Sequence, residues 1–277
     1  MLRTIDHAGY YETRIILMAL SLAIAAYYLY YHRDRRYLIM FVSGSVFAIV
    51  TEYFLQFRGL RGPGYSFSIF DLTMTGIIGN VVQGTLEGGT QSLFAFWFTD
   101  LRLSQARWQR WSGFFLLCVI VVLLAFIAGM LSRHRAISST RPMFAIASIA
   151  LFTAVIFVSL VIAWRQDALS QLANFFGGLL LFAFLNFEPL QLTGSRYIGV
   201  SFGPETVPVS MPLQILMMLL SNVFESAGSK LHYLSIPLFL KMVTLEWRED
   251  EGSGVPYSIQ QLQDLVQRGL RKRTKPF

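Results

Sequence analysis

Long apolar runs separated by short polar stretches dominate the pattern along the chain. Five runs, near residues 15–31, 37–50, 113–131, 143–164 and 172–187, approach or exceed the length needed to cross about 30 Å of hydrocarbon as a helix. Two less regular regions, around residues 71–91 and 209–243, are each predicted to form one further helix. The pattern therefore predicts seven helices, at about 14–31, 37–57, 67–87, 112–132, 143–164, 171–188 and 209–226.

Two shorter apolar stretches do not fit a simple crossing. Ser92–Leu101 is too short to span alone and is expected near the membrane interface. Leu231–Val243 holds Pro237 and Lys241 and is expected at the interface or as an eighth crossing. We expect residues 1–245 to form an all-α transmembrane bundle, and residues 246–277 to form a cytoplasmic tail with a short basic amphipathic helix.

The segment "DLTMTGIIGNVVQGTLEGGTQ", residues 71–91, mixes polar and apolar residues. At about 100° per residue, one helical face gathers its polar and small residues, and the opposite face is apolar. In a membrane, the polar face must point into protein or into a water-filled cavity. Either the two glycines and the amides serve close helix packing, or the face lines a cavity. The residues of this face are Thr73, Gly76, Asn80, Gln83, Gly84 and Glu87.

Composition supports a polytopic membrane protein. Of the 277 residues, 54% are hydrophobic and only 14% are charged, whereas roughly a quarter is charged in a soluble domain. The net charge of +7 lies in short loops and the tail, where it sets topology or meets anionic lipid, and no nucleic-acid partner is expected. The bias favours an outside or lumenal N-terminus and a cytoplasmic C-terminus, in the endoplasmic reticulum or a bacterial inner membrane.

Ionisable residues within predicted spans are the main functional candidates. Glu52 and Asp71 are expected at the outer end of the bundle, with Glu188 as a third acid there. Glu87, Asn222 and Glu225 are expected near the inner end. Glu52 is the leading candidate, because its neighbours are apolar and a buried Glu can act as a proton donor.

Each acid also has a structural alternative. Two glycines follow Glu87 and could simply end its helix at the interface. Asp71 could cap a helix N-terminus, and Glu52 could pair with Arg58. Glu188 precedes Pro189 and could be a loop residue, and Glu225 could pair with Lys230 at the interface.

Missing motifs narrow the chemistry. The chain has four histidines, His7, His32, His134 and His232, and all are expected near loops or ends, so histidine-rich iron or haem sites are not predicted. The lone Cys118 argues against structural disulfides and thiolate metal sites. There is no P-loop, no nucleophile elbow and no Asp-rich pair for a magnesium–diphosphate site. We therefore expect no cofactor and no metal, and either acid–base chemistry by carboxylates or transport.

The layout of about seven helices, with Glu52 near the end of the second and an acid in the last, resembles the small integral-membrane terpene cyclases of meroterpenoid pathways. In that family the second-helix glutamate lies in a Trp-Glu-x-x-Tyr-like motif, whereas this chain has Thr51–Glu52–Tyr53 without the Trp. Glu225 would match the acid of the last helix. The resemblance implies protonation of a terminal epoxide or alkene by a neutral carboxylic acid, with aromatic rings stabilising the carbocation.

Three functions follow from these observations. The first is a membrane enzyme acting on a lipophilic small molecule, with Glu52 as general acid and Asp71 or Glu225 as its partner. The second is a proton-linked carrier or channel whose pathway helix 67–87 lines, and the third is a heptahelical protein without chemistry. Broken helices with a central ion pair at mid-membrane would favour the carrier, and a closed pocket with acids clustered at one end would favour the enzyme. The oligomeric state stays open.

Overall fold

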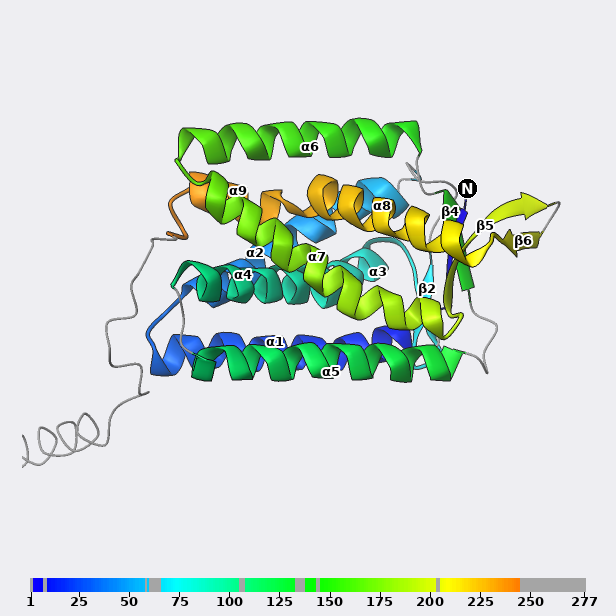
Figure 1. Cartoon of the computed structure of the whole chain (residues 1–277), viewed down its shortest axis with the longest axis horizontal. Helices are drawn as coiled ribbons and strands as arrows, with labels where there is room; N and C mark the ends of the chain where they lie inside the picture. The colour runs from blue at the N-terminus through cyan, green and yellow to red at the C-terminus, as the bar shows by residue number, and fades with distance from the viewer. Residues whose placement is uncertain are drawn as a thin grey trace, which may run out of the picture.

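The computed structural model describes residues 2–6, 9–57, 59, 66–104, 108–132, 138–142, 145–202 and 205–244. Most of these residues are helical, which confirms the all-α class, and the helices lie side by side in one bundle (Figure 1). Five described helices are long and apolar enough to cross a membrane, so the chain is a multi-pass membrane protein. They are α1 (Tyr10–Tyr31), α2 (Arg36–Glu52) with the π-helical turn η1 (Tyr53–Phe57) that follows it, α5 (Trp108–Ser132), α6 (Ile146–Arg165) and α7 (Leu169–Leu192).

The predicted helix over 67–87 is wrong in its first half. Residues 67–74 form a β-hairpin of β2 (Phe67–Ile69) and β3 (Leu72–Met74). Its two turn residues, Phe70 and Asp71, have φ values of 47° and 64°, the left-handed conformation that two-residue hairpins require and that Asp tolerates well. The helix begins only at Gly76, as α3 (Gly76–Gln83), and continues through the π-helical η2 (Gly84–Gly89) into α4 (Thr90–Leu103).

The stretch Ser92–Leu101 lies inside the bundle, which corrects its expected place at the interface. It forms most of α4, which packs between α2 and α7. The Phe94 ring, 1% exposed, packs against the Phe182 ring of α7 with 5.1 Å between centroids. Its aromatic residues therefore belong to the protein core and do not form a belt at the membrane surface.

Glycines let η2 lie against the backbone of α2. A Cβ atom added to Gly88 would lie 2.3 Å from the carbonyl oxygen of Gly44, and one added to Gly84 would lie 2.7 Å from the backbone nitrogen of Ile49. The predicted packing role of Gly84 is thus confirmed, whereas that of Gly76 is wrong, because nothing lies within 4 Å of its side-chain position. This backbone contact fixes the position of Glu87 relative to α2.

The last helical segment is broken into α8 (Met211–Lys230) and α9 (His232–Phe239). Pro237 has no N–H to donate to the Tyr233 carbonyl four residues earlier, and the Ser43 hydroxyl of α2 donates to that carbonyl instead, at 2.7 Å. At about 1.5 Å per residue α9 is only about 12 Å long, so Leu231–Val243 is not an eighth crossing. Glu188 and Pro189 lie within α7 and not in the predicted loop.

The pattern of apolar runs did not predict a four-stranded antiparallel sheet. Its strands are β1 (Leu2–Asp6), β4 (Ser138–Pro142), β5 (Arg196–Phe202) and β6 (Glu205–Pro208), in the order β4-β1-β5-β6. The sheet covers one end of the bundle, called the sheet end below (Figure 1). The predicted tail and its amphipathic helix lie outside the described residues.

Candidate active site

Three glutamates from three separate helical segments lie within electrostatic range of one lysine inside the bundle. Glu52 ends α2, Glu87 lies in η2, and Glu225 lies in α8. The ammonium group of Lys230, at the end of α8, interacts electrostatically with all three carboxyl groups. Lys230 makes no ion pair within 4 Å with any described residue, so it interacts with the three acids over longer distances. We call these four residues the acid cluster.

The sheet contributes an arginine to the acid cluster. Arg3 of β1 is only 2% exposed, and its Nη1 lies 2.9 Å from Oε1 of Glu225. Ser221, one helical turn before Glu225, accepts a hydrogen bond from the same Nη1 and donates to Oε1 of Glu225, both at 3.4 Å. A strand at the N-terminus therefore fixes an acid more than 200 residues away in the sequence.

Tyrosine hydroxyl groups also interact with Glu87 and Glu52. The Tyr10 hydroxyl of α1 donates to Oε1 of Glu87 at 3.0 Å, and the guanidinium group of Arg14 lies 4.6 Å from the Tyr10 ring centroid. The hydroxyl of Tyr233, at the start of α9, lies within electrostatic range of Glu52 and Glu87. Tyr10, Arg14 and Tyr233 are all buried, so this side of the acid cluster is shielded from solvent.

The acid cluster lies nearer the sheet end than the opposite end. Arg36 and Asp100 form an ion pair at the opposite end, so the start of α2 and the end of α4 share a depth. Glu52 follows Arg36 by 16 residues and Glu87 precedes Asp100 by 13, which is about 24 Å and about 20 Å at 1.5 Å per residue. The predicted separation of an outer Glu52 from inner Glu87 and Glu225 is therefore wrong.

The helices depart from regular geometry where they meet the acid cluster. The π-helical turn η1 follows Glu52 directly, Glu87 lies within η2, and α8 breaks into α9 directly after Lys230. Single π-helical turns occur frequently at functional sites, and broken helices in membranes occur where backbone groups find partners inside the protein. Three irregularities in helix geometry therefore occur at residues of the acid cluster or directly beside them.

Sequence patterns missed His232. It was expected near a loop or end, but its ring is 9% exposed and its Nε2 lies 3.4 Å from the Thr51 hydroxyl, beside Glu52. Its Nδ1 is buried without a hydrogen-bond partner in the described part of the chain. His232 follows Lys230 by two residues at the α8–α9 break, and only the fold brings it to Thr51.

Two of the predicted site residues lie away from the acid cluster. Asp71 and Thr73 belong to the exposed β2–β3 hairpin, so Asp71 neither caps a helix nor faces the interior. The hairpin is held to α1 by the Phe70 backbone N–H, which donates to Oε1 of Glu12 at 2.9 Å. The prediction for Thr73 assumed a helical face. In the hairpin, side chains alternate between two faces of the strand, so that assumption does not hold.

The remaining predicted residues are buried. Asn80 donates from Nδ2 to the Ile49 carbonyl at 2.7 Å, an interhelical contact of the kind that the packing interpretation predicts. Gln83 is 2% exposed, and its Oε1 has no hydrogen-bond partner among the described residues. Asn222 is 3% exposed and accepts from Arg196 at 3.4 Å. The arrangement leaves several buried polar atoms available to a bound molecule.

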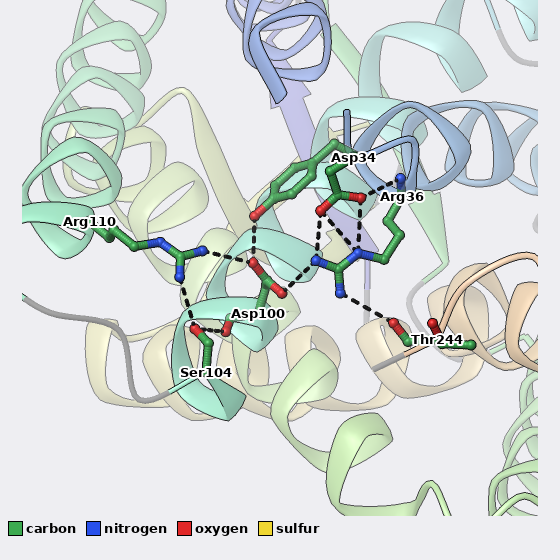
Figure 2. A network of polar contacts seen from close by, with 7 residues as sticks. Asp34, Arg36, Asp100, Ser104, Arg110 and Thr244 are labelled. Atoms are coloured by element: carbon green, nitrogen blue, oxygen red, sulfur yellow. Dashed lines mark hydrogen bonds and ion pairs between the residues drawn. The ribbon is translucent and has the colours of Figure 1, made fainter. Parts of the chain in front are cut away.

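A second polar network closes the opposite end of the bundle (Figure 2). Asp100 of α4 lies 3.1 Å from Arg36 and 3.2 Å from Arg110, and accepts from the Tyr37 hydroxyl at 3.0 Å. Arg36 also forms an ion pair with Asp34 and donates to the Thr244 carbonyl. These side chains contact one another, so this network holds α2, α4 and α5 together, and we assign it a structural role.

Comparison with known proteins gives no relative: no family model, no curated protein and no solved structure matches the chain. The resemblance to terpene cyclases therefore stays a prediction. Within the described part of the chain, no group of three or more His, Cys, Asp or Glu side chains is arranged to hold a metal ion.

Proposed function

We propose that the chain is a membrane-embedded enzyme that acts on a lipophilic small molecule by proton transfer from and to carboxyl groups. In this proposal α3–α4 and α8–α9 also lie across the membrane, which completes seven passes. The N-terminal sheet faces the outside or the lumen, and the C-terminus faces the cytoplasm.

The convergence of Glu52, Glu87 and Glu225 on Lys230 carries the proposal. Charged side chains inside membrane spans are costly and rare, and acids there therefore tend to be functional. Here the acids lie toward the covered end of the bundle, which is one of the two features expected of an enzyme. Packing alone gives no reason to place three acids from three helices around one lysine.

The contacts of the acid cluster suggest separate roles for its members. Glu225 accepts from Arg3 and Ser221, which orients its carboxyl group as the proton acceptor. Glu52, beside the π-helical turn, is the proposed proton donor, and Lys230 compensates charge as the proton leaves. The rings of Tyr10 and Tyr233 can stabilise positive charge that develops on the substrate. Protonation of a terpenoid epoxide or alkene is the most specific form of this proposal.

Untargeted mass spectrometry of lipids from cells that express the protein tests this function. Cells with the wild-type chain should contain a lipophilic product that is absent from cells with Glu52→Gln. Asp71→Asn is the matched control, because Asp71 is exposed and lies outside the acid cluster. Identical lipid profiles for the wild type and Glu52→Gln, with both proteins folded in the membrane, would contradict an enzymatic role.

A proton-linked carrier is the second candidate, and the helix irregularities favour it. Discontinuous helices and charged groups in the bundle interior are features of secondary transporters. A carrier would acidify the lumen of proteoliposomes in response to a substrate gradient without altering the substrate. Unchanged substrate together with proton movement would therefore favour the carrier over the enzyme.

A further inference from the structure

The inner face of the sheet places two buried arginines beside the acid cluster. Arg3 of β1 pairs in register with Ile198 of β5, and Arg196 pairs with Ile5. Since side chains alternate along a strand, Arg3 and Arg196 lie on the same face of the sheet, and both are at most 2% exposed. Two guanidinium groups on one covered face are costly unless other groups compensate them.

Side chains from α7 and α8 complete this face. The guanidinium group of Arg196 lies 3.9 Å from the ring centroid of Phe187, and its Nη2 donates to Oδ1 of Asn222 at 3.4 Å. The Nδ2 atom of the same Asn222 amide is buried and has no hydrogen-bond partner among the described residues. A hydrogen-bond donor is therefore held unused beside an arginine, away from water.

Two carboxyl groups also act on this face. Glu225 forms the ion pair with Arg3, and Glu188 of α7 interacts electrostatically with Arg196. Glu188 is half-buried, and its Oε1 has no hydrogen-bond partner in the described residues. A bound anion would accept hydrogen bonds from Arg3, which also pairs with Glu225. It would also accept from the guanidinium group of Arg196 and from the amide nitrogen of Asn222.

We propose that Arg196, Arg3 and Asn222 form a subsite for an oxyanion, the phosphate or carboxylate head group of the substrate. The fork of a guanidinium group matches the paired oxygens of phosphate and carboxylate. This proposal rests on the proposed function, which supplies a lipophilic substrate. The tail of that substrate would lie among the apolar helices. It defines the substrate class as anionic amphiphiles whose head lies at the sheet end.

The subsite also indicates which part of the substrate reacts. Glu225 follows Ser221 and Asn222 by about one helical turn, roughly 5 Å along the axis of α8. With the head group held at Asn222, the acid cluster meets atoms within about two helical turns of that head. The transformed bond therefore lies close to the polar end of the molecule, so an epoxide or alkene fits this subsite only where it lies near the head group and not at the far end of a long tail.

Binding of dodecyl phosphate to the purified full chain in nanodiscs of uncharged lipid tests the subsite. Dodecyl phosphate should bind at least tenfold more tightly than dodecanol, which has the same tail without the anion. Asn222→Asp should remove this preference, because it places a second carboxylate beside Arg196. Arg102→Gln, at an exposed position of α4 near the opposite end, should leave it unchanged.

Two further measurements distinguish a free anion from an amphiphile head group, and distinguish the subsite from the proposed acid chemistry. Competition by inorganic phosphate would show that the subsite also takes a free anion, and lack of competition would restrict it to amphiphiles. Equal binding of dodecyl phosphate and dodecanol by the wild type would overturn the proposal. An unchanged preference of folded Asn222→Asp for dodecyl phosphate over dodecanol would also overturn it. Glu52→Gln should still bind dodecyl phosphate, so loss of product with retained binding separates the acid chemistry from the subsite.

Discussion

The network in Figure 2 predicts that Asp100 stabilises the end of the bundle opposite the sheet. Asp100→Asn removes the carboxylate that lies between Arg36 and Arg110, while the amide retains one oxygen for the Tyr37 hydroxyl. The side chains of the two arginines are 20% and 32% exposed, and that of Asp100 is 9% exposed, so solvent screens the pairs only in part.

The magnitude follows from these contacts. Hydrogen bonds to charged groups contribute about 1.5–3 kcal/mol each, and breaking a buried ion pair costs about 3–5 kcal/mol. Arg36 keeps its ion pair with Asp34, and Arg110 keeps a hydrogen bond to Ser104, so neither arginine loses every partner. We therefore expect Asp100→Asn to lower the free energy of unfolding by about 2–3 kcal/mol, between about 30-fold and 150-fold in the folding equilibrium.

Reversible unfolding in mixed detergent micelles measures this free energy. Asp167→Asn is the matched control, because Asp167 is exposed and its left-handed backbone, with a φ of 51°, also suits Asn. The control should shift the free energy by less than about 0.5 kcal/mol. If Asp100→Asn were no more destabilising than Asp167→Asn, the network would not hold the three helices together.

Three further predictions concern packing, the acid cluster and topology. Gly88→Ala should destabilise the protein by about 1–3 kcal/mol in the same unfolding assay, because its methyl group would overlap α2. Gly177→Ala is the control and should be neutral, because the nearest atom to its added methyl group lies at 3.6 Å. Equal stabilities of the two variants would contradict the backbone contact between η2 and α2. Tyr10→Phe should lower stability by about 1.5–3 kcal/mol, because the hydroxyl that donates to a glutamate is lost, and an unchanged unfolding midpoint would argue against that hydrogen bond. In a Cys118→Ala background, a cysteine at the exposed Val207 should react with an impermeant maleimide from outside intact cells, and labelling only after lysis would reverse the proposed orientation.

Local patterns predicted those parts of the structure that depend on local sequence. The apolar runs predicted the positions of the five long helices, because a membrane span needs a long apolar helix wherever it occurs. Helical spacing within residues 76–87 correctly predicted that Asn80, Gln83 and Gly84 are buried, since this part of the segment is helical.

Contacts between distant segments could not be read from spacing. The sheet joins the N-terminus to residues 138–142 and 196–208, and none of these strands is long or apolar enough to stand out alone. Arg3 counted only toward topology and Lys230 only as an interface partner of Glu225, because their further partners come from other elements. Asp71 looked like the start of a helix, because a two-residue hairpin turn and a helix cap both favour Asp.

The most direct test of the acid cluster is the rate of product formation by the reconstituted double variant Glu52→Gln/Glu225→Gln. If the glutamates act as one unit, either single variant should lose nearly all activity, and the double variant should be no slower than the slower single variant. Reconstituted Asp71→Asn should retain the wild-type rate. If the two losses multiply as for independent sites, or if the folded double variant turns over at the wild-type rate, the acid cluster is not the active site.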